Sequence, residues 1–136
     1  MIISDKRKIT EIQEAFQHQY PYLKLEFYRK GHEAAEGSYA KDQHDSDASI
    51  SEIRTKHNEG DLQIKPNMTV AEMESVFEKK YGLHVQVFRQ SGDLWLQTTS
   101  TDTWTLEEQN LHGQRSREKM KETDQEEVSR DYREQP

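Results

Sequence analysis

The sequence predicts an α+β domain of two βαβ units, with both helices on one face of a single sheet. One observation behind this is the stretch Thr69 to Thr99, which is patterned as an amphipathic helix followed by a hairpin. Another is that Ile3 to Tyr20 matches Ile64 to Tyr81 in the spacing of its apolar and aromatic residues. We expect a ferredoxin-like or similar arrangement, extended by a C-terminal hairpin and a short helix.

Residues 69–81 are predicted to form an amphipathic helix, and residues 9–19 are predicted to form its counterpart in the first unit. Thr69 and Glu72 have the spacing of a capping box, and Gly82 follows as a stop signal. In the helix at residues 69–81 the apolar residues recur at spacings of three and four, which places them on one face. They are Val70, Met73, Val76, Phe77 and Tyr81.

Residues 83–99 predict a two-stranded hairpin, because apolar and polar residues alternate on both sides of Ser91-Gly92. We take these two residues as the hairpin loop, which fixes the cross-strand pairs. The expected pairs are Val87 with Leu96 on the core face and Phe88 with Trp95 on the opposite face. One face of the hairpin is therefore aliphatic, and the other is partly aromatic.

The repeat defines two copies, at about 2–30 and 61–99. Each copy is patterned as strand, helix and strand, and their second strands align after a slip of one residue. The matches at the end of that strand are Tyr28 with Phe88 and Arg29 with Arg89. Any two amphipathic βαβ segments share some patterning, but the aromatic and charged matches exceed that requirement. We therefore expect an internal duplication.

We place a single domain at residues 1–112. Between the copies, residues 31–48 have almost no large apolar side chain and are expected to form a flexible linker. A capping box at 105–108 predicts a short helix that ends at Gly113. Beyond it, residues 113–136 are almost entirely charged or polar and predict a disordered tail.

The composition excludes several classes of protein. The chain has 136 residues, of which 31% are hydrophobic and 33% charged, and a formal net charge of -7. It has no cysteine, which excludes disulfides, thiolate nucleophiles and Cys-ligated metals. No apolar run has the length of a secretory signal or a membrane span, so we expect a soluble, cytoplasmic, acidic protein without membrane contact. The negative charge makes nucleic acid an unfavourable partner.

The sequence contains no motif of a catalytic, cofactor or metal site. Nucleotide-binding loops, nucleophile elbows and zinc-protease motifs are absent, so we expect no enzyme activity and no cofactor. The linker contains a group of Asp, His and Glu residues, whose side chains can bind metal ions, but their spacing departs from that of a calcium loop. We interpret it as a solvated polar segment. The group comprises Asp42, His44, Asp45 and Asp47, with His32 and Glu33 nearby.

The aromatic face of the hairpin is the best candidate for function. Either the segment Trp104 to Leu111 folds over it as a small second core, or it contacts a partner protein or a second copy of the chain. We expect a small non-catalytic protein–protein interaction or adaptor module. An RNA or single-stranded nucleic-acid module that uses the same face and a small enzyme with an unrecognised site are the alternatives. The candidate partner-binding residues are Tyr28, Arg29, His84, Phe88, Arg89 and Trp95.

Overall fold

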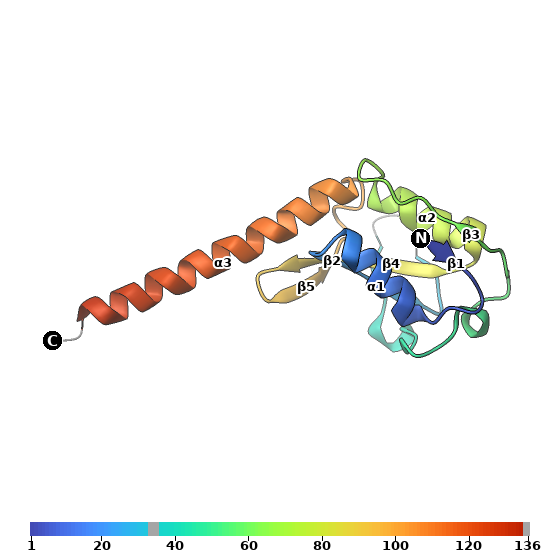
Figure 1. The fold of residues 1–136 in the computed structure, drawn as a ribbon, viewed down its shortest axis with the longest axis horizontal. Coiled ribbons are helices and arrows are strands. Elements are labelled where there is room, and N and C mark those ends of the chain that lie inside the picture. Colours follow the sequence, from blue (N-terminus) through green and yellow to red (C-terminus); the bar gives the residue numbers. More distant parts are fainter. Residues whose placement is uncertain (33–35, 135–136) are drawn as a thin grey trace.

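Figure 1 shows a mixed α+β fold, in which a small body carries one long C-terminal helix. The structure is a computed structural model that describes residues 1–32 and 36–134, with side chains up to residue 122. Within these ranges the chain forms three α-helices and two antiparallel sheets. Every helix of the described part is too short or too polar to cross a bilayer.

The order strand, helix, strand occurs twice along the chain, as β1-α1-β2 and as β3-α2-β4. The helices are α1 (Ile9–Gln19), α2 (Val70–Tyr81) and α3 (Leu106–Glu134), with short 3-10 helices η1 (Ala40–Asp42) and η2 (Ile50–Ile53). The strands are β1 (Ile2–Ile3), β2 (Leu23–Tyr28), β3 (Gly60–Asp61), β4 (His84–Ser91) and β5 (Leu94–Gln97). Strand β1 pairs with β3, while the larger sheet has the order β2-β4-β5.

The prediction of one sheet is therefore wrong, because the two strands that flank each helix lie in different sheets. Strand β1 is two residues long, and a turn at Ser4 to Arg7 follows it directly. A strand of two residues is too short to pair along the six residues of β2. It pairs instead with the equally short β3, and β2 pairs antiparallel with β4 over its whole length.

Helix α2 begins and ends where its sequence predicts. The Thr69 hydroxyl accepts a hydrogen bond from the Glu72 N–H at 3.1 Å, which satisfies one of the free donors of the first turn. At the other end Gly82 adopts a left-handed φ of 65°, a conformation that favours glycine. Helix α1 has Lys8 at the capping position, and there the Glu11 carboxylate accepts the Lys8 N–H at 3.2 Å.

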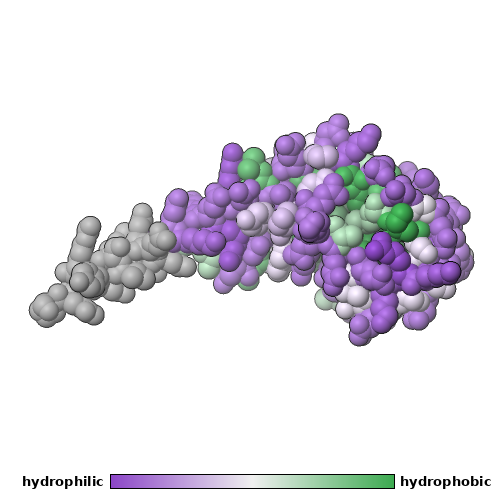
Figure 2. Space-filling model, in the orientation of Figure 1, coloured by the Kyte–Doolittle hydropathy of each residue, from purple (hydrophilic) through white to green (hydrophobic). Residues whose placement is uncertain are grey.

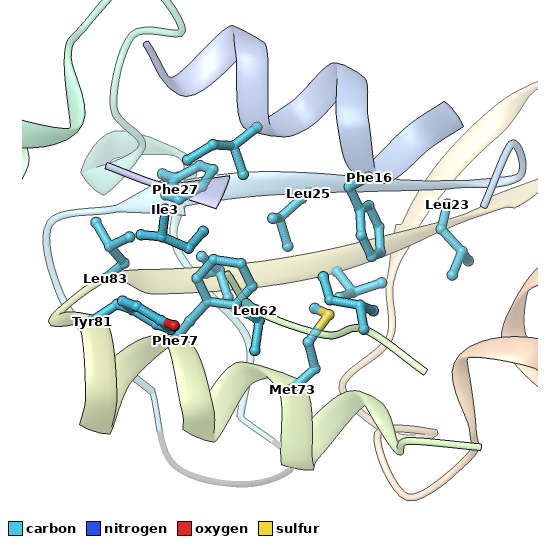
Figure 3. Packing of buried hydrophobic residues seen from close by; sticks show 14 of the residues in the cluster. Ile3, Phe16, Leu23, Leu25, Phe27, Leu62, Met73, Phe77, Tyr81 and Leu83 are labelled. Carbon is cyan, nitrogen blue, oxygen red and sulfur yellow. The ribbon is translucent and has the colours of Figure 1, made fainter. Parts of the chain in front are cut away.

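Both helices cover the same face of the larger sheet with apolar side chains (Figure 3). The rings of Phe27 in β2 and Phe77 in α2 meet edge to face at 6.2 Å. Alternate residues of β2 and β4 point into this core, and their neighbours point to the opposite face. The largest fully buried side chains include Tyr81, Phe16, Phe27, Phe77, Ile3, Ile9, Ile12, Leu23 and Leu25.

The first half of the chain (residues 2–53) and the second half (60–122) fix the start of their helix in the same way. In each half two backbone hydrogen bonds join the helix start to a later segment. In the first half Ile9 N–H donates to Ala48 and Ile50 N–H donates to Arg7; in the second Val70 N–H donates to Trp104 and Leu106 N–H donates to Met68. The start of α3 therefore corresponds to η2 in the first half.

Helix α3 does not end at Gly113, so the prediction of a short helix is wrong. A Cβ at this position would lie 2.8 Å from the Cβ of Tyr22; glycine here permits close helix packing and is not a stop signal. The helix crosses the boundary expected at residue 112. Figure 2 shows mainly hydrophilic side chains along its described part. The disorder expected of residues 113–136 in solution stays a prediction.

Candidate functional site

The loop of the hairpin lies at residues 92–93, one residue later than predicted. Gly92 has a φ of 63°, and tight hairpin loops need a positive φ at their first position, so the glycine must begin the loop. The predicted pairs are therefore wrong. The observed pairs are Phe88 with Gln97, Arg89 with Leu96, Gln90 with Trp95 and Ser91 with Leu94. The shift preserves the faces, and Phe88 and Trp95 still project from the same side.

The sheet face opposite α1 and α2, which we call the open face, carries most of the predicted site. It is formed by alternate residues of three strands. They are Lys24, Glu26 and Tyr28 of β2, His84, Gln86, Phe88 and Gln90 of β4, and Trp95 and Gln97 of β5. Tyr28, His84, Phe88 and Trp95 thus share one face.

Residues 36–44 cover one end of the open face. The backbone of Ser38 exchanges two hydrogen bonds with the Gln97 side chain, at 2.8 and 2.7 Å. The Gln43 amide donates to Glu26 at 2.8 Å. Tyr28 is only 3% exposed, and burial, followed by the charge of Glu26, raises the pKa of Tyr28 to about 12. Tyr28 is therefore buried beneath residues 36–44.

The other end of the open face remains partly exposed around a lysine and two aromatic rings. The Lys24 ammonium lies 5.2 Å from the ring centre of Phe88 and 5.1 Å from that of Trp95. Both distances are in the range of cation–π attraction. The Glu26 carboxylate is 3.8 Å from the same ammonium. We call Lys24, Phe88 and Trp95 the aromatic cluster. Lys24 is not among the residues predicted from the sequence, although it lies directly across from Phe88.

The two arginines of the predicted site do not join this cluster. Arg89 projects toward the helices, where it donates to the Gln109 side chain at 2.8 Å and stacks 5.4 Å from the Trp104 ring centre. Trp104 therefore lies against Arg89 on the helix side of β4 and does not cover the aromatic side of the hairpin. Arg29 is exposed beyond the end of β2, where its guanidinium lies 3.4 Å from the Lys41 carbonyl oxygen.

His84 lies at the covered end of the open face, away from the aromatic cluster. Its Nδ1 is 3.5 Å from a Glu78 carboxylate oxygen. A Cβ on Gly31 would lie 2.6 Å from that oxygen and 2.8 Å from the His84 nitrogen. Glycine therefore lets the backbone pass close to both side chains.

A cavity of about 240 Å³ lies beside α2, bordered by residues 31–32, Val85 of β4 and Asp102, and it holds a buried carboxylate. Glu74 is 7% exposed, and it accepts the Val87 N–H at 3.0 Å. Burial raises the pKa of Glu74 to about 7, with Asp102 adding to the rise, while the Val87 hydrogen bond and His32 at 3.8 Å oppose it. The cavity lining is Gly31, His32, Ala71, Glu74, Ser75, Glu78, Lys79, Val85 and Asp102.

Glu74 also explains how β5 separates from β4. One residue beyond the last pair, Phe88 with Gln97, the Thr98 N–H donates to the Val87 carbonyl at 3.2 Å, while Glu74 and not β5 accepts the Val87 N–H. A carboxyl with a pKa near 7 can both accept and donate a proton at neutral pH. Glu74 is not among the residues predicted from the sequence, although a carboxylate four residues after Val70 and three before Phe77 falls on the apolar stripe and signals burial.

The linker residues considered as metal ligands have other partners where the structure describes them. Among the residues that the structure describes, no group of three or more His, Asp or Glu side chains could hold a metal ion. Asp45 accepts the N–H of Asp47 at 3.0 Å, and the His44 N–H donates to the Phe27 carbonyl. Glu33 lies outside the described residues.

Comparison with known proteins places the chain in no family. Models of known protein families, curated proteins and solved structures were all searched, and none of the three searches returned a match.

Proposed function

We propose that this protein is a non-catalytic protein–protein interaction module that contacts its partner through the aromatic cluster. The observation that carries this proposal is the position of Lys24 against Phe88 and Trp95 on a sheet face that the helices leave open. Partly exposed aromatic side chains with a cation among them are typical of contact surfaces. The neighbouring half of the open face is closed by residues 36–44, which gives the surface a defined border.

The cluster favours a partner that offers apolar side chains beside a carboxylate. Lys24 can turn its ammonium to that carboxylate while its aliphatic stem stays between the rings. A nucleic-acid partner has less support, because Arg89 points to the helices and Glu26 lies beside Lys24. The net charge of -7 also opposes a phosphate backbone.

A pull-down with identification of partners tests this function. The Phe88→Ala/Trp95→Ala variant should lose partners that the wild type retains, while circular dichroism shows that it still folds. The matched control is Ile2→Ala/Leu111→Ala, which removes two side chains that are 51% and 40% exposed elsewhere on the surface. The proposal fails if the two variants retain the same partners.

Catalysis at the Glu74 cavity is a second candidate function, favoured by one observation. A buried carboxyl with a pKa of about 7 beside His32 and Asp102 has the character of a general acid or base. A thermal-shift screen of small amines and carboxylic acids at pH 7 tests it. A ligand of the cavity should stabilise the wild type and not the Glu74→Gln variant, whereas equal shifts would argue against a site there.

We also infer that the two halves arose by internal duplication. Equivalent hydrogen bonds at the helix starts support this, and so does the bridge Tyr28–Gln43, which matches the pair Phe88–Gln97. A chimera in which residues 70–80 replace residues 9–19 tests the equivalence. It should fold cooperatively, because the apolar side chains of α2 would fill the same core positions. A chimera that does not fold would contradict the inference.

A further inference from the structure

Strand β5 is uncovered over most of its length, and Ser38 binds only the side chain of its last residue, Gln97. Leu94 and Leu96 project from its helix side and are 62% and 44% exposed. Trp95 projects from the open face and is partly exposed. Antiparallel strands with one face in water usually alternate apolar and polar residues, whereas this strand presents three consecutive large apolar side chains. Such a surface indicates contact with a molecule outside the chain.

Helix α3 leaves β5 uncovered because it lies against β2 and β4. It crosses Tyr22 at Gly113, where the two backbones approach closely. One turn later the Ser116 hydroxyl donates to the Gln90 carbonyl at 3.1 Å and accepts the Gly92 N–H at 3.1 Å. The helix therefore supports the hairpin from β4 and its loop, and the leucines of β5 remain beside it.

The outer edge of β5 offers backbone hydrogen-bonding groups. The two-residue loop makes Ser91 and Leu94 a hydrogen-bonded pair, and bonded pairs alternate along an antiparallel ladder. The N–H and C=O groups of Trp95 and Gln97 therefore point away from β4. Within the described residues, β4 is the only strand that pairs with β5.

This edge also lacks three features by which proteins prevent strands from pairing. Edge strands are usually protected by charged side chains, proline or a bulge. Residues 94–97 are Leu-Trp-Leu-Gln and contain none of these. The segment is uncharged in a chain whose net charge is -7, so two copies can approach here without opposing like charges.

We infer that β5 pairs antiparallel with β5 of a second copy of this chain, about a two-fold axis at Trp95. The outward backbone groups allow residue 95 to pair with 95, 95 with 97, or 97 with 97. In the register that pairs residue 95 with residue 95, each Leu94 faces Leu96 of the other copy, so all four exposed leucines are buried together. It also sets Asp93 opposite Gln97 of the other copy, so no like charges face each other.

A second copy fits this edge because the strand is complementary to itself. Two-fold symmetry repeats every contact, and an antiparallel strand pair accommodates such an axis. The result is a continuous six-stranded sheet. The dimer edge shares Trp95 with the aromatic cluster, but it uses the backbone of Trp95 and the leucines on the helix side of β5. The inference therefore goes beyond the proposed function, and Phe88→Ala, which alters the cluster but not β5, distinguishes the two. Because the edge is four residues long, the dimer belongs to the transient class of interfaces.

Sedimentation equilibrium over a concentration series tests the dimer. The wild type should shift from the monomer mass of 16.1 kDa to twice this value, in a series that reaches about 1 mM because short interfaces are weak. Leu94→Lys/Leu96→Lys should remain monomeric, since charges on both strands repel across the pair. Leu111→Lys on α3 should dimerise as the wild type does. Phe88→Ala should also dimerise, which distinguishes the dimer from the contacts of the aromatic cluster.

Disulfide crosslinking tests the register, and the cysteine-free chain suits it. A mixture of Leu94→Cys and Leu96→Cys variants should crosslink, because the two positions face each other across the dimer at a distance that a disulfide spans. Each variant alone should crosslink much less. Rapid crosslinking of Leu96→Cys alone would overturn this register. A wild type that stays monomeric throughout, or a lysine variant that still dimerises, would overturn the dimer itself.

Discussion

The two halves of the chain share a hydrogen-bond pattern and differ in how the chain leaves its second strand. In the first half it leaves β2 at Tyr28 and returns at Gln43, after residues 36–42 have passed over the open face. In the second half β4 continues beyond Phe88 to the hairpin loop, and β5 returns to Gln97. The two returns correspond, so the difference lies in the segments between them.

These two segments have opposite effects on the open face. The first covers Tyr28. The second carries Trp95 to a position beside Phe88, which matches Tyr28 in the repeat, and leaves Trp95 and Phe88 partly exposed. The comparison teaches that the shared pattern builds the core, and that the unshared segments decide which part of the sheet is free to contact another molecule.

A further difference lies at equivalent positions of the two helices. The Gln13 amide in α1 donates to the Leu25 carbonyl at 2.9 Å, and the Glu74 carboxylate in α2 accepts the Val87 N–H at 3.0 Å. Both side chains satisfy a backbone group of the adjacent strand. Only the second of them titrates, so the stability of the second half should depend on pH.

The largest predicted effect tests whether the halves contribute equally to the core. Phe16→Ala and Phe77→Ala each remove a fully buried ring at equivalent helix positions. Each should lower the free energy of unfolding by about 3–5 kcal/mol, because the cavity adds to the lost burial. Urea denaturation measures the two values. Phe88→Ala, in the partly exposed cluster, is the control and should cost much less. A near-neutral result for either core variant would show that its half contributes little.

The second prediction concerns pH. The pKa of Glu74 is raised from 4.5 to about 7 in the folded protein, so between these values the unfolded chain releases a proton that the folded chain keeps. The contribution of Glu74 to the free energy of unfolding is therefore greatest below pH 4.5, and this contribution is lost as the pH rises to 7. The loss should be roughly 1–3 kcal/mol.

Comparing wild type with Glu74→Gln isolates this contribution, because every other titrating group, His44 included, is common to both proteins. The variant should keep a hydrogen bond to Val87, lose the pH dependence and be the more stable protein at pH 7.5. The reciprocal change Gln13→Glu should destabilise at neutral pH, since it removes the donor to Leu25 and adds a carboxylate beside Glu26. Parallel stability curves for wild type and Glu74→Gln would contradict this account.

The predictable parts of the fold are those with strong local signals. Helix α2 has a capping threonine, an apolar stripe and a final glycine, each of which acts within a few residues. The hairpin and the shared face of Phe88 and Trp95 follow from the alternation of residues. The loop position did not follow, because it depends on the positive φ of Gly92 and on the contact of its N–H with Ser116.

The parts that sequence reasoning missed depend on contacts between distant segments. A glycine such as Gly113 is a common signal for the end of a helix. Here the glycine lies inside α3, and its close approach to Tyr22 explains why it is present. The cover over Tyr28 comes from hydrogen bonds of Ser38 and Gln43, which have no periodic pattern. The single sheet was expected because strands flanking a helix usually pair in parallel, whereas the observed strands are too short or pair across the halves.

The smallest predicted effect compares the two helix starts. Thr69 and Lys8 occupy the capping position with nearly the same extended backbone, at φ -75° and -86° and a ψ of 157° in both. Thr69→Ala removes the acceptor of the Glu72 N–H and should cost about 1 kcal/mol. Lys8→Thr supplies the acceptor that α1 lacks, and it should raise the free energy of unfolding by roughly 0.5–1 kcal/mol, because no backbone change is needed.

Chemical denaturation of the two variants and their double mutant measures both effects. The two caps lie in different helices, so their effects should add, and the double mutant should be close to wild type. A Lys8→Thr variant that is less stable than wild type would show that the first half requires its lysine, since each capping residue also bridges to a later segment, Lys8 to Ser49 and Thr69 to Thr105. The shared backbone pattern would then support α1 and α2 through different side-chain contacts.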